Sequence, residues 1–187
     1  MPSWSLLIVK LALKREENCL SEVEAHLRKV FPGLTEIREE KVSNHFLAEA
    51  YSPHRNQYNS TKILLAISKE FSQRDVNRIL VITSVDLYVK GLNFVFGEAQ
   101  CPGRTALIST YRLKPEFYGE ANGELFKRRV RKEAVHELCH TFGLTHCPNP
   151  FCVMHFSNTI NDTDMKEDEP CSYCKNKLEQ NILTILS

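Results

Sequence analysis

Residues 136–147 read HELCHTFGLTHC and place three histidines, one glutamate and two cysteines within twelve positions. His136 and His140 are four residues apart in a segment with helical spacing, so both imidazoles project from one helix face and can reach a single metal ion. Glu137 follows the first histidine directly and projects beside such an ion. This spacing predicts a metal site built on a helix.

The third ligand of this site has to come from beyond the helix. Gly143 can end the helix, because a left-handed backbone costs glycine little, and His146 is then available. Catalytic zinc takes three protein ligands and keeps a fourth position for water, whose pKa it lowers to about 7. We therefore predict that His136, His140 and His146 hold a catalytic zinc. Glu137 is placed to act as the general base toward the zinc-bound water and to support hydrolysis of an amide.

A second ligand set follows in the pattern C-x4-C…C-x-x-C, formed by Cys147, Cys152, Cys171 and Cys174. Four thiolates around one ion make a closed structural zinc site, and metal binding there would order a C-terminal region that has few core residues. A redox role for Cys171 and Cys174 is the alternative, but no thioredoxin-like strand–helix unit surrounds them. The expected cofactors are two zinc ions per chain, one catalytic and one structural.

His146 and Cys147 are neighbours in the chain but belong to different predicted sites. In an extended segment, successive side chains point to opposite sides. We therefore predict that His146 faces the catalytic zinc and Cys147 the structural zinc. The structural site would then support the position of the third histidine.

Outward from the motif, the chain alternates between strand-like and helix-like segments. Apolar runs or alternation predict strands within residues 4–13, 38–46, 79–89, 92–100 and 105–113. Helical spacing occurs within residues 21–33, 54–71, 122–143 and 174–186. This order predicts an α/β fold with a twisted, mixed but mostly parallel sheet, packed helices and one helix that carries the active site.

Two charged stretches are expected to lie in solvent. Residues 161–170, NDTDMKEDEP, are acidic and predict an exposed loop. A solvated helix face is expected for the basic cluster Arg128, Arg129, Arg131 and Lys132. We expect one compact catalytic unit with two parts: residues 1–143, which end in the active-site helix, and residues 144–187, a small zinc-stabilised C-terminal region.

Composition argues against several function classes. The 187 residues have a formal net charge of +1, which disfavours nucleic acid and anionic membrane as partners. No apolar run approaches the roughly 20 residues of a membrane-spanning helix, and the apolar N-terminus is interrupted by lysines and lacks a cleavage site. The expected compartment is the cytoplasm, where disulfides are rare. Small buried hydrophobic roles are expected for Cys19, Cys101 and Cys139.

The motif HExxHxxGxxH with a methionine downstream resembles that of the metzincin clan of zinc metalloproteases. Residues 136–174, with a cysteine directly after the third histidine and a late C-x-x-C, resemble the archaemetzincin family in particular. The resemblance implies a metzincin-like fold with Met154 in a methionine turn beneath the catalytic zinc. It also implies that residues 92–100 form the edge strand above the cleft, which binds an extended substrate. The substrate-binding residues expected there are Asn93, Phe94, Val95, Phe96 and Gly97.

One position departs from better-known metzincins, several of which carry a tyrosine two residues after the turn methionine. Phe156 occupies this position, so it offers no phenol to assist the transition state. Tyr111 and Tyr173 are candidate substitutes whose location the sequence does not give. We therefore expect slow or narrowly directed proteolysis.

These features predict a zinc-dependent metallopeptidase that acts as a monomer on a peptide or protein substrate in an extended conformation. The alternative is a non-catalytic module with two structural zincs, whose cleft binds a peptide or partner without cutting it. Glu137 favours the enzyme, because a purely structural three-histidine site has no use for a general base.

Overall fold

The computed structural model describes residues 1–14 and 19–186. Within this part of the chain, the main sheet has five strands in the order β2-β1-β5-β8-β7; the first four are parallel, and β7 is antiparallel to β8. The predicted α/β class with a mixed, mostly parallel sheet is confirmed. The strands are β2 (Leu34–Val42), β1 (Trp4–Leu11), β5 (Arg78–Thr83), β8 (Thr105–Ser109) and β7 (Gly97–Ala99).

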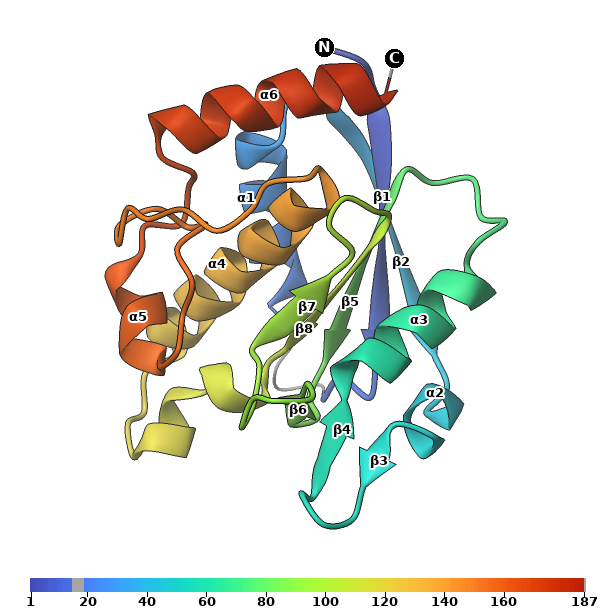
Figure 1. The fold of residues 1–187 in the computed structure, drawn as a ribbon, viewed down its shortest axis with the longest axis vertical. Coiled ribbons are helices and arrows are strands. Elements are labelled where there is room, and N and C mark those ends of the chain that lie inside the picture. Colours follow the sequence, from blue (N-terminus) through green and yellow to red (C-terminus); the bar gives the residue numbers. More distant parts are fainter. Residues whose placement is uncertain (15–18, 187) are drawn as a thin grey trace.

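Helices cover both faces of this sheet (Figure 1). Alternate residues of β1 enter different cores, with Leu6 on the side of α1 (Leu20–Val30) and α4 (Gly123–Thr141), and Leu7 on the side of α3 (Ser60–Glu70). β5, with the sequence RILVIT, is buried at every position. A continuous apolar run is what a central parallel strand needs when helices lie on both sides of it.

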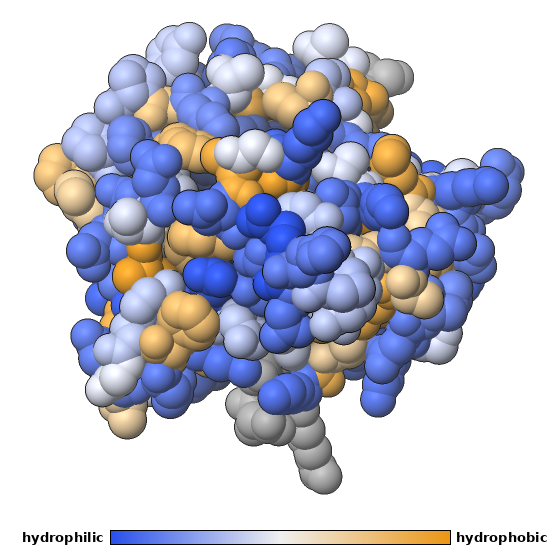
Figure 2. Space-filling model, turned by 60° about the horizontal axis from the view of Figure 1, so that its bottom comes forward, coloured by the Kyte–Doolittle hydropathy of each residue, from blue (hydrophilic) through white to orange (hydrophobic). Residues whose placement is uncertain are grey.

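A smaller sheet and several short helices complete the fold. The face that comes forward in Figure 2 is mostly hydrophilic and carries its hydrophobic side chains in separate patches. No helix in the described residues combines the length and the apolar character needed to cross a bilayer. The short elements are α2 (His45–Ala48), β3 (Tyr51–Ser52), β4 (Gln57–Asn59), β6 (Leu87–Tyr88), and the 3-10 helices η2 (Tyr111–Leu113) and η3 (Pro115–Tyr118).

Side-chain hydrogen bonds fix both ends of α4, the helix that carries the histidine motif. At its start, the Asn122 side chain accepts the Leu125 N–H at 3.0 Å, which satisfies one of the free amide groups of the first turn. At its end, α6 (Ser172–Leu186) crosses the top of the molecule (Figure 1), and its Asn181 side chain donates to the Phe142 carbonyl at 2.7 Å. A local cap therefore holds the start of α4, and a distant part of the chain holds the end that carries the motif.

The exposed loop predicted for residues 161–170 was wrong for its first half. Residues Ile160–Met165 form the short helix α5, which begins with a capping box between Thr159 and Asp162. In this arrangement the threonine hydroxyl and the aspartate carboxylate each satisfy a backbone amide of the first turn. Lys166, which follows α5, is only 2% exposed. The acidic composition of this stretch concealed its capping signal.

The solvated face predicted for the basic cluster on α4 was wrong for two of its four members. Arg128 is exposed, but Arg129 and Lys132 are buried. The Arg129 guanidinium donates two hydrogen bonds to the Asp164 carboxylate, at 2.8 and 2.6 Å. The Lys132 ammonium donates to the Thr163 carbonyl at 2.8 Å. These buried cations fasten α5 to α4.

Candidate active site

α4 and the turn after it bring the three predicted histidine ligands together. His136 and His140 lie one turn apart on the same helix face, and Gly143, with φ of 81°, turns the chain after the helix. The chain then returns with His146. One ring nitrogen from each histidine lies within 4.8 Å of the other two.

Backbone carbonyls fix the tautomers of two of these histidines. The Nδ1 atoms of His136 and His140 lie 2.7 and 2.6 Å from the carbonyl oxygens of Val153 and Leu144. Because a carbonyl only accepts, both Nδ1 atoms carry the hydrogen and both Nε2 atoms keep a lone pair. The two Nε2 atoms are 3.1 Å apart, near the about 3.3 Å expected for two nitrogens on one tetrahedral zinc. The donors and their spacing therefore fit zinc.

Burial keeps these imidazoles in the neutral form that binds a metal. It lowers the pKa of His136 well below its usual value, and the nearby Lys166 charge adds to the effect. Burial also lowers the pKa of His140. Partial burial, followed by the charge of His140, lowers the pKa of His146 to about 4.

Glu137 lines the same cavity as the three histidines, with 5% of its surface exposed. Gly97 of the edge strand packs directly against it, because a Cβ atom at position 97 would fall 2.6 Å from both Cγ and Oε1 of Glu137. Burial raises the pKa of Glu137 well above its usual value, and the negative charge of Glu133 raises it further. The carboxylate is thus held between α4 and β7.

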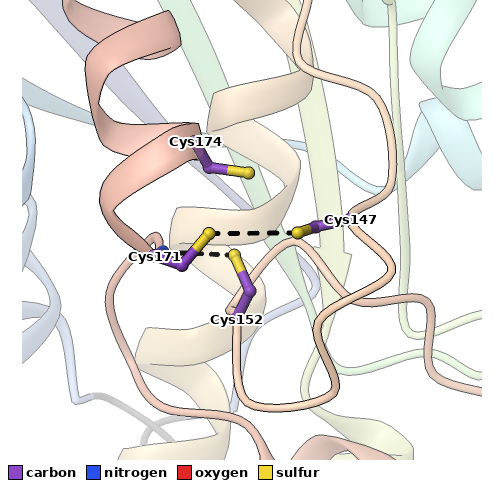
Figure 3. A group of neighbouring side chains, drawn as sticks. All are labelled: Cys147, Cys152, Cys171 and Cys174. Carbon is purple, nitrogen blue, oxygen red and sulfur yellow. Dashed lines mark hydrogen bonds between the residues drawn. The ribbon is translucent and has the colours of Figure 1, made fainter.

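The four predicted cysteine ligands also converge (Figure 3). The sulfur atoms of Cys147, Cys152, Cys171 and Cys174 lie within 4.8 Å of one another. The Cys147 and Cys171 sulfurs are 3.9 Å apart, close to the about 3.8 Å expected for two thiolates on one tetrahedral zinc and far longer than a disulfide. The Cys171 N–H donates to the Cys152 sulfur at 3.2 Å, which stabilises a thiolate. This group fits a closed zinc site.

One segment connects the two ligand groups. His146 lies in the histidine group and Cys147, its neighbour, lies in the cysteine group. The carbonyl of the fully buried Met154 accepts the Cys147 N–H at 2.9 Å, and the preceding Val153 carbonyl is the one that orients His136. The turn at Met154 therefore contacts both groups through its backbone.

A cavity of about 600 Å³ opens beside the histidines and Glu137. Four of the five predicted substrate-binding residues line it: Phe94, Val95, Phe96 and Gly97. Asn93 does not line it. Asn93 is exposed, and its carbonyl accepts hydrogen bonds from the Arg55 and Gln57 side chains at 2.7 and 3.0 Å.

The edge strand is shorter than the segment 92–100 predicted from the sequence. β7 covers only Gly97–Ala99, and Val95 makes an isolated bridge to Leu87. Phe94 and Phe96 pack edge-to-face with ring centroids 5.1 Å apart, so they form a small aromatic cluster before the strand begins. The alternation of these two phenylalanines with other residues suggested a strand, but the segment is irregular and the two rings pack on each other.

The structure also locates Phe156, the two tyrosines considered as substitutes for the missing phenol, and the three cysteines outside the cysteine group. Phe156 lines the cavity, and its ring centroid is 4.9 Å from that of His146. Neither Tyr111 nor Tyr173 lines the cavity, so neither stands in for the missing phenol there. Cys101 is exposed and lines the cavity, contrary to the prediction of a buried role, whereas Cys19 and Cys139 are buried as predicted.

Among the polar residues of the cavity that the sequence analysis missed are Glu133, Ser157 and Lys166. Glu133 could have been found, because it precedes His136 by three residues and therefore shares its helix face. Ser157 and Lys166 lie in turns whose path depends on the packing of α5, and no periodic pattern marks them.

A sequence model of peptidase family M54 matches residues 15–180. The chain belongs to this family, the archaemetzincins. The archaemetzincin of Pyrococcus furiosus is 51% identical over 138 residues, which cover 72% of this chain and 71% of the relative. That of Methanocaldococcus jannaschii is 39% identical over 175 residues, covering 93% and 95%. The crystal structure of the Methanopyrus kandleri archaemetzincin matches with a TM-score of 0.85 at 35% identity, covering 97% and 96%.

Membership of M54 identifies the chain as a zinc metallopeptidase by family. The similarity to archaemetzincins therefore covers most of the chain and not only residues 136–174, and it includes the fold. Zinc is also the metal that the histidine and cysteine groups fit.

Proposed function

We propose that the chain hydrolyses peptide bonds with Glu137 as general base and with His136, His140 and His146 holding a catalytic zinc. The observation that carries the proposal is the place of Glu137, a buried carboxylate that shares one cavity with three neutral imidazoles and with the edge strand β7. Zinc bound there supplies a Lewis acid that polarises the substrate carbonyl and lowers the pKa of the attacking water. A purely structural ion would have no use for this carboxylate.

Glu137 moves the proton in this proposal. Its carboxylate takes a proton from the attacking water and, as the carboxylic acid, gives it to the leaving amine when the C–N bond breaks. Gly97 limits where the carboxylate can lie, because the two residues are already in close contact. The enclosed position strengthens the electrostatic interactions that stabilise the transition state.

β7 offers backbone groups to an extended substrate. The Phe96 carbonyl and the Gln100 N–H form backbone hydrogen bonds to β8, at 2.8 and 3.0 Å. The backbone N–H and C=O groups of alternate residues from 96 to 100 therefore point toward β8. In an antiparallel ladder the intervening residues point the other way, which directs the N–H and C=O groups of Gly97 and Ala99 to the open edge. A substrate that adds there as a further strand passes alongside Glu137.

The cysteine group is proposed to hold a second, structural zinc, so that each monomer carries two ions. Four thiolates leave no ligand position open for chemistry. Through Cys147, this ion would fix the peptide unit that also carries His146. Its contribution to catalysis is therefore the position of the third histidine.

A non-catalytic peptide-binding module remains the second candidate, and Phe156 is the observation that favours it. Its ring packs against His146 where several metzincins offer a phenol. The same feature is compatible with an enzyme that is slow or narrowly specific. Glu137 favours the enzyme, because a binding module does not need a base.

The test compares wild type with Glu137→Gln and, as a matched control, Glu124→Gln, which changes an exposed glutamate of the same helix. A peptide library measures turnover, and mass spectrometry under native conditions measures zinc content. We expect equal zinc in all three proteins and a loss of about 10²–10⁴-fold in turnover for Glu137→Gln alone. Equal turnover by all three zinc-loaded proteins, or turnover by none of them, would refute the proposed peptidase function.

A further inference from the structure

Glu133 and Lys166 form an end of the cavity that the proposed reaction does not use. Glu133 lies one turn before Glu137 on the face of α4 that carries His136, and Lys166 follows α5. Both residues line the cavity, although their side chains are only 4% and 0% exposed. One helical turn is about 5.4 Å, so this end lies within reach of a substrate side chain next to the bond that is cut.

The hydrogen bonding of Glu133 is incomplete. Its Oε1 atom lies 3.5 Å from Lys166 Nζ and 3.5 Å from Thr163 Oγ1, whereas charge-assisted bonds to a carboxylate are about 2.7–2.9 Å long. Lys166 makes a shorter bond, of 3.1 Å, to the His155 carbonyl. Because a carboxylate can accept about four hydrogen bonds, Glu133 has acceptor capacity left.

Ser157 is a second incompletely bonded polar group among the residues that line the cavity. It lines the cavity, and its enclosed Oγ atom has no hydrogen-bond partner among the described residues. The neighbouring Phe156 supplies an aromatic wall. Enclosed polar atoms without partners are costly, so a ligand that supplies both a donor and an acceptor gains affinity here.

We propose that Glu133, Ser157 and Lys166 form a specificity subsite for a neutral amide side chain, glutamine or asparagine, at a residue flanking the scissile bond. The inference rests on the proposed peptidase function. The amide N–H groups donate to Glu133, and the amide oxygen accepts from the Ser157 hydroxyl. Lys166 supplies the charge that balances Glu133, so that the subsite is neutral overall.

The same arrangement disfavours the other classes of side chain. A lysine or arginine of the substrate would bring a second cation to a carboxylate that Lys166 already balances, in a place with little water. A glutamate or aspartate would face the carboxylate of Glu133. An apolar side chain would cover the polar groups without satisfying them, which is the situation that gives strong discrimination in enzyme sites.

The test uses peptides that differ only in one residue flanking the scissile bond, which is glutamine, methionine, lysine or glutamate. Methionine has nearly the length of glutamine but offers no amide. Each flank is varied in turn, and kcat/KM is measured with wild type. We expect glutamine to exceed the other three by about tenfold or more on one flank. Equal rates for glutamine and methionine on both flanks, or a preference for methionine, would overturn the proposal.

A double variant assigns the preference to the ion pair. Glu133→Met with Lys166→Met replaces the pair by apolar side chains of similar length, an exchange that buried ion pairs often tolerate. The glutamine-to-methionine ratio cancels any loss common to both peptides, and it should fall to about one or below. Lys127→Met, at a partly exposed lysine on the same helix, should keep the wild-type ratio. An unchanged ratio in the double variant would contradict the assignment.

A binding measurement separates failure of the subsite from failure of the function. Zinc-loaded Glu137→Gln protein is titrated with fluorescent versions of the glutamine and methionine peptides. The subsite predicts about tenfold tighter binding of the glutamine peptide even if wild type cuts nothing, an outcome that would refute the hydrolysis alone. Glu137-dependent cleavage with equal affinities and equal rates for the two peptides would refute the subsite alone.

Discussion

Gly97→Ala should disable the enzyme without touching a metal ligand. The added Cβ atom would fall 2.6 Å from Cγ and Oε1 of Glu137 and 2.7 Å from the carbonyl oxygen of Leu107. Leu107 belongs to β8 inside the sheet, so it cannot withdraw, and Glu137 has to move. Relative to an ordinary contact of about 3.4 Å, the carboxylate must shift by about 0.8 Å.

A displacement of about 1 Å in a catalytic group costs about 10²-fold in rate, or about 2.7 kcal/mol of transition-state stabilisation. We therefore expect kcat/KM of Gly97→Ala to fall about 10²-fold while its zinc content equals that of wild type. The assay is peptide turnover with zinc measured on the same sample. Gly123→Ala is the control, because nothing lies within 4 Å of its added Cβ. Wild-type turnover by Gly97→Ala would refute the assigned position of the general base.

Three further outcomes are expected. Cys147→Ser should lower the zinc affinity of the histidine group about tenfold or more, as measured by competition with a chelator, whereas Cys101→Ser should leave it unchanged. Equal zinc affinities in the two variants would show that the two sites are independent. Arg129→Met should lower the free energy of unfolding by about 2 kcal/mol in urea titrations, because it leaves Asp164 unpaired. The control Arg128→Met, at an exposed arginine, should change this free energy by under about 0.5 kcal/mol. Equal effects of the two variants would contradict the stabilising role of the Arg129–Asp164 pair. Chelation of zinc should lower the thermal midpoint and re-addition should restore it; an unchanged midpoint would contradict metal-supported folding.

The motif around the histidines was predictable because helix periodicity acts at short range. The four-residue spacing of His136 and His140 fixes their common face, and Gly143 supplies the turn that brings His146 back. The alternation of strands and helices likewise predicted the sheet. The cysteine group was predictable because its members have few other uses at that spacing.

The cavity residues outside the histidine motif are positioned by tertiary packing, which leaves no periodic pattern in the sequence. Lys166 is buried next to α5, which Arg129 and Lys132 hold against α4, although the charges of these residues by themselves suggested exposure to solvent. The strand predicted over residues 92–100 failed before Gly97, because the aromatic rings there pack on each other and Asn93 turns its carbonyl to Arg55 and Gln57. Such contacts join segments far apart in sequence, beyond the range of local signals.

Anomalous diffraction at the zinc edge, on crystals of the zinc-loaded protein, tests the two adjoining sites most directly. One peak should lie about 2.0–2.1 Å from the ring nitrogens of His136, His140 and His146. A second should lie about 2.3 Å from all four sulfurs of the cysteine group, with His146 and Cys147 ligating different ions. A single peak, or one ion shared by His146 and Cys147, would contradict the account.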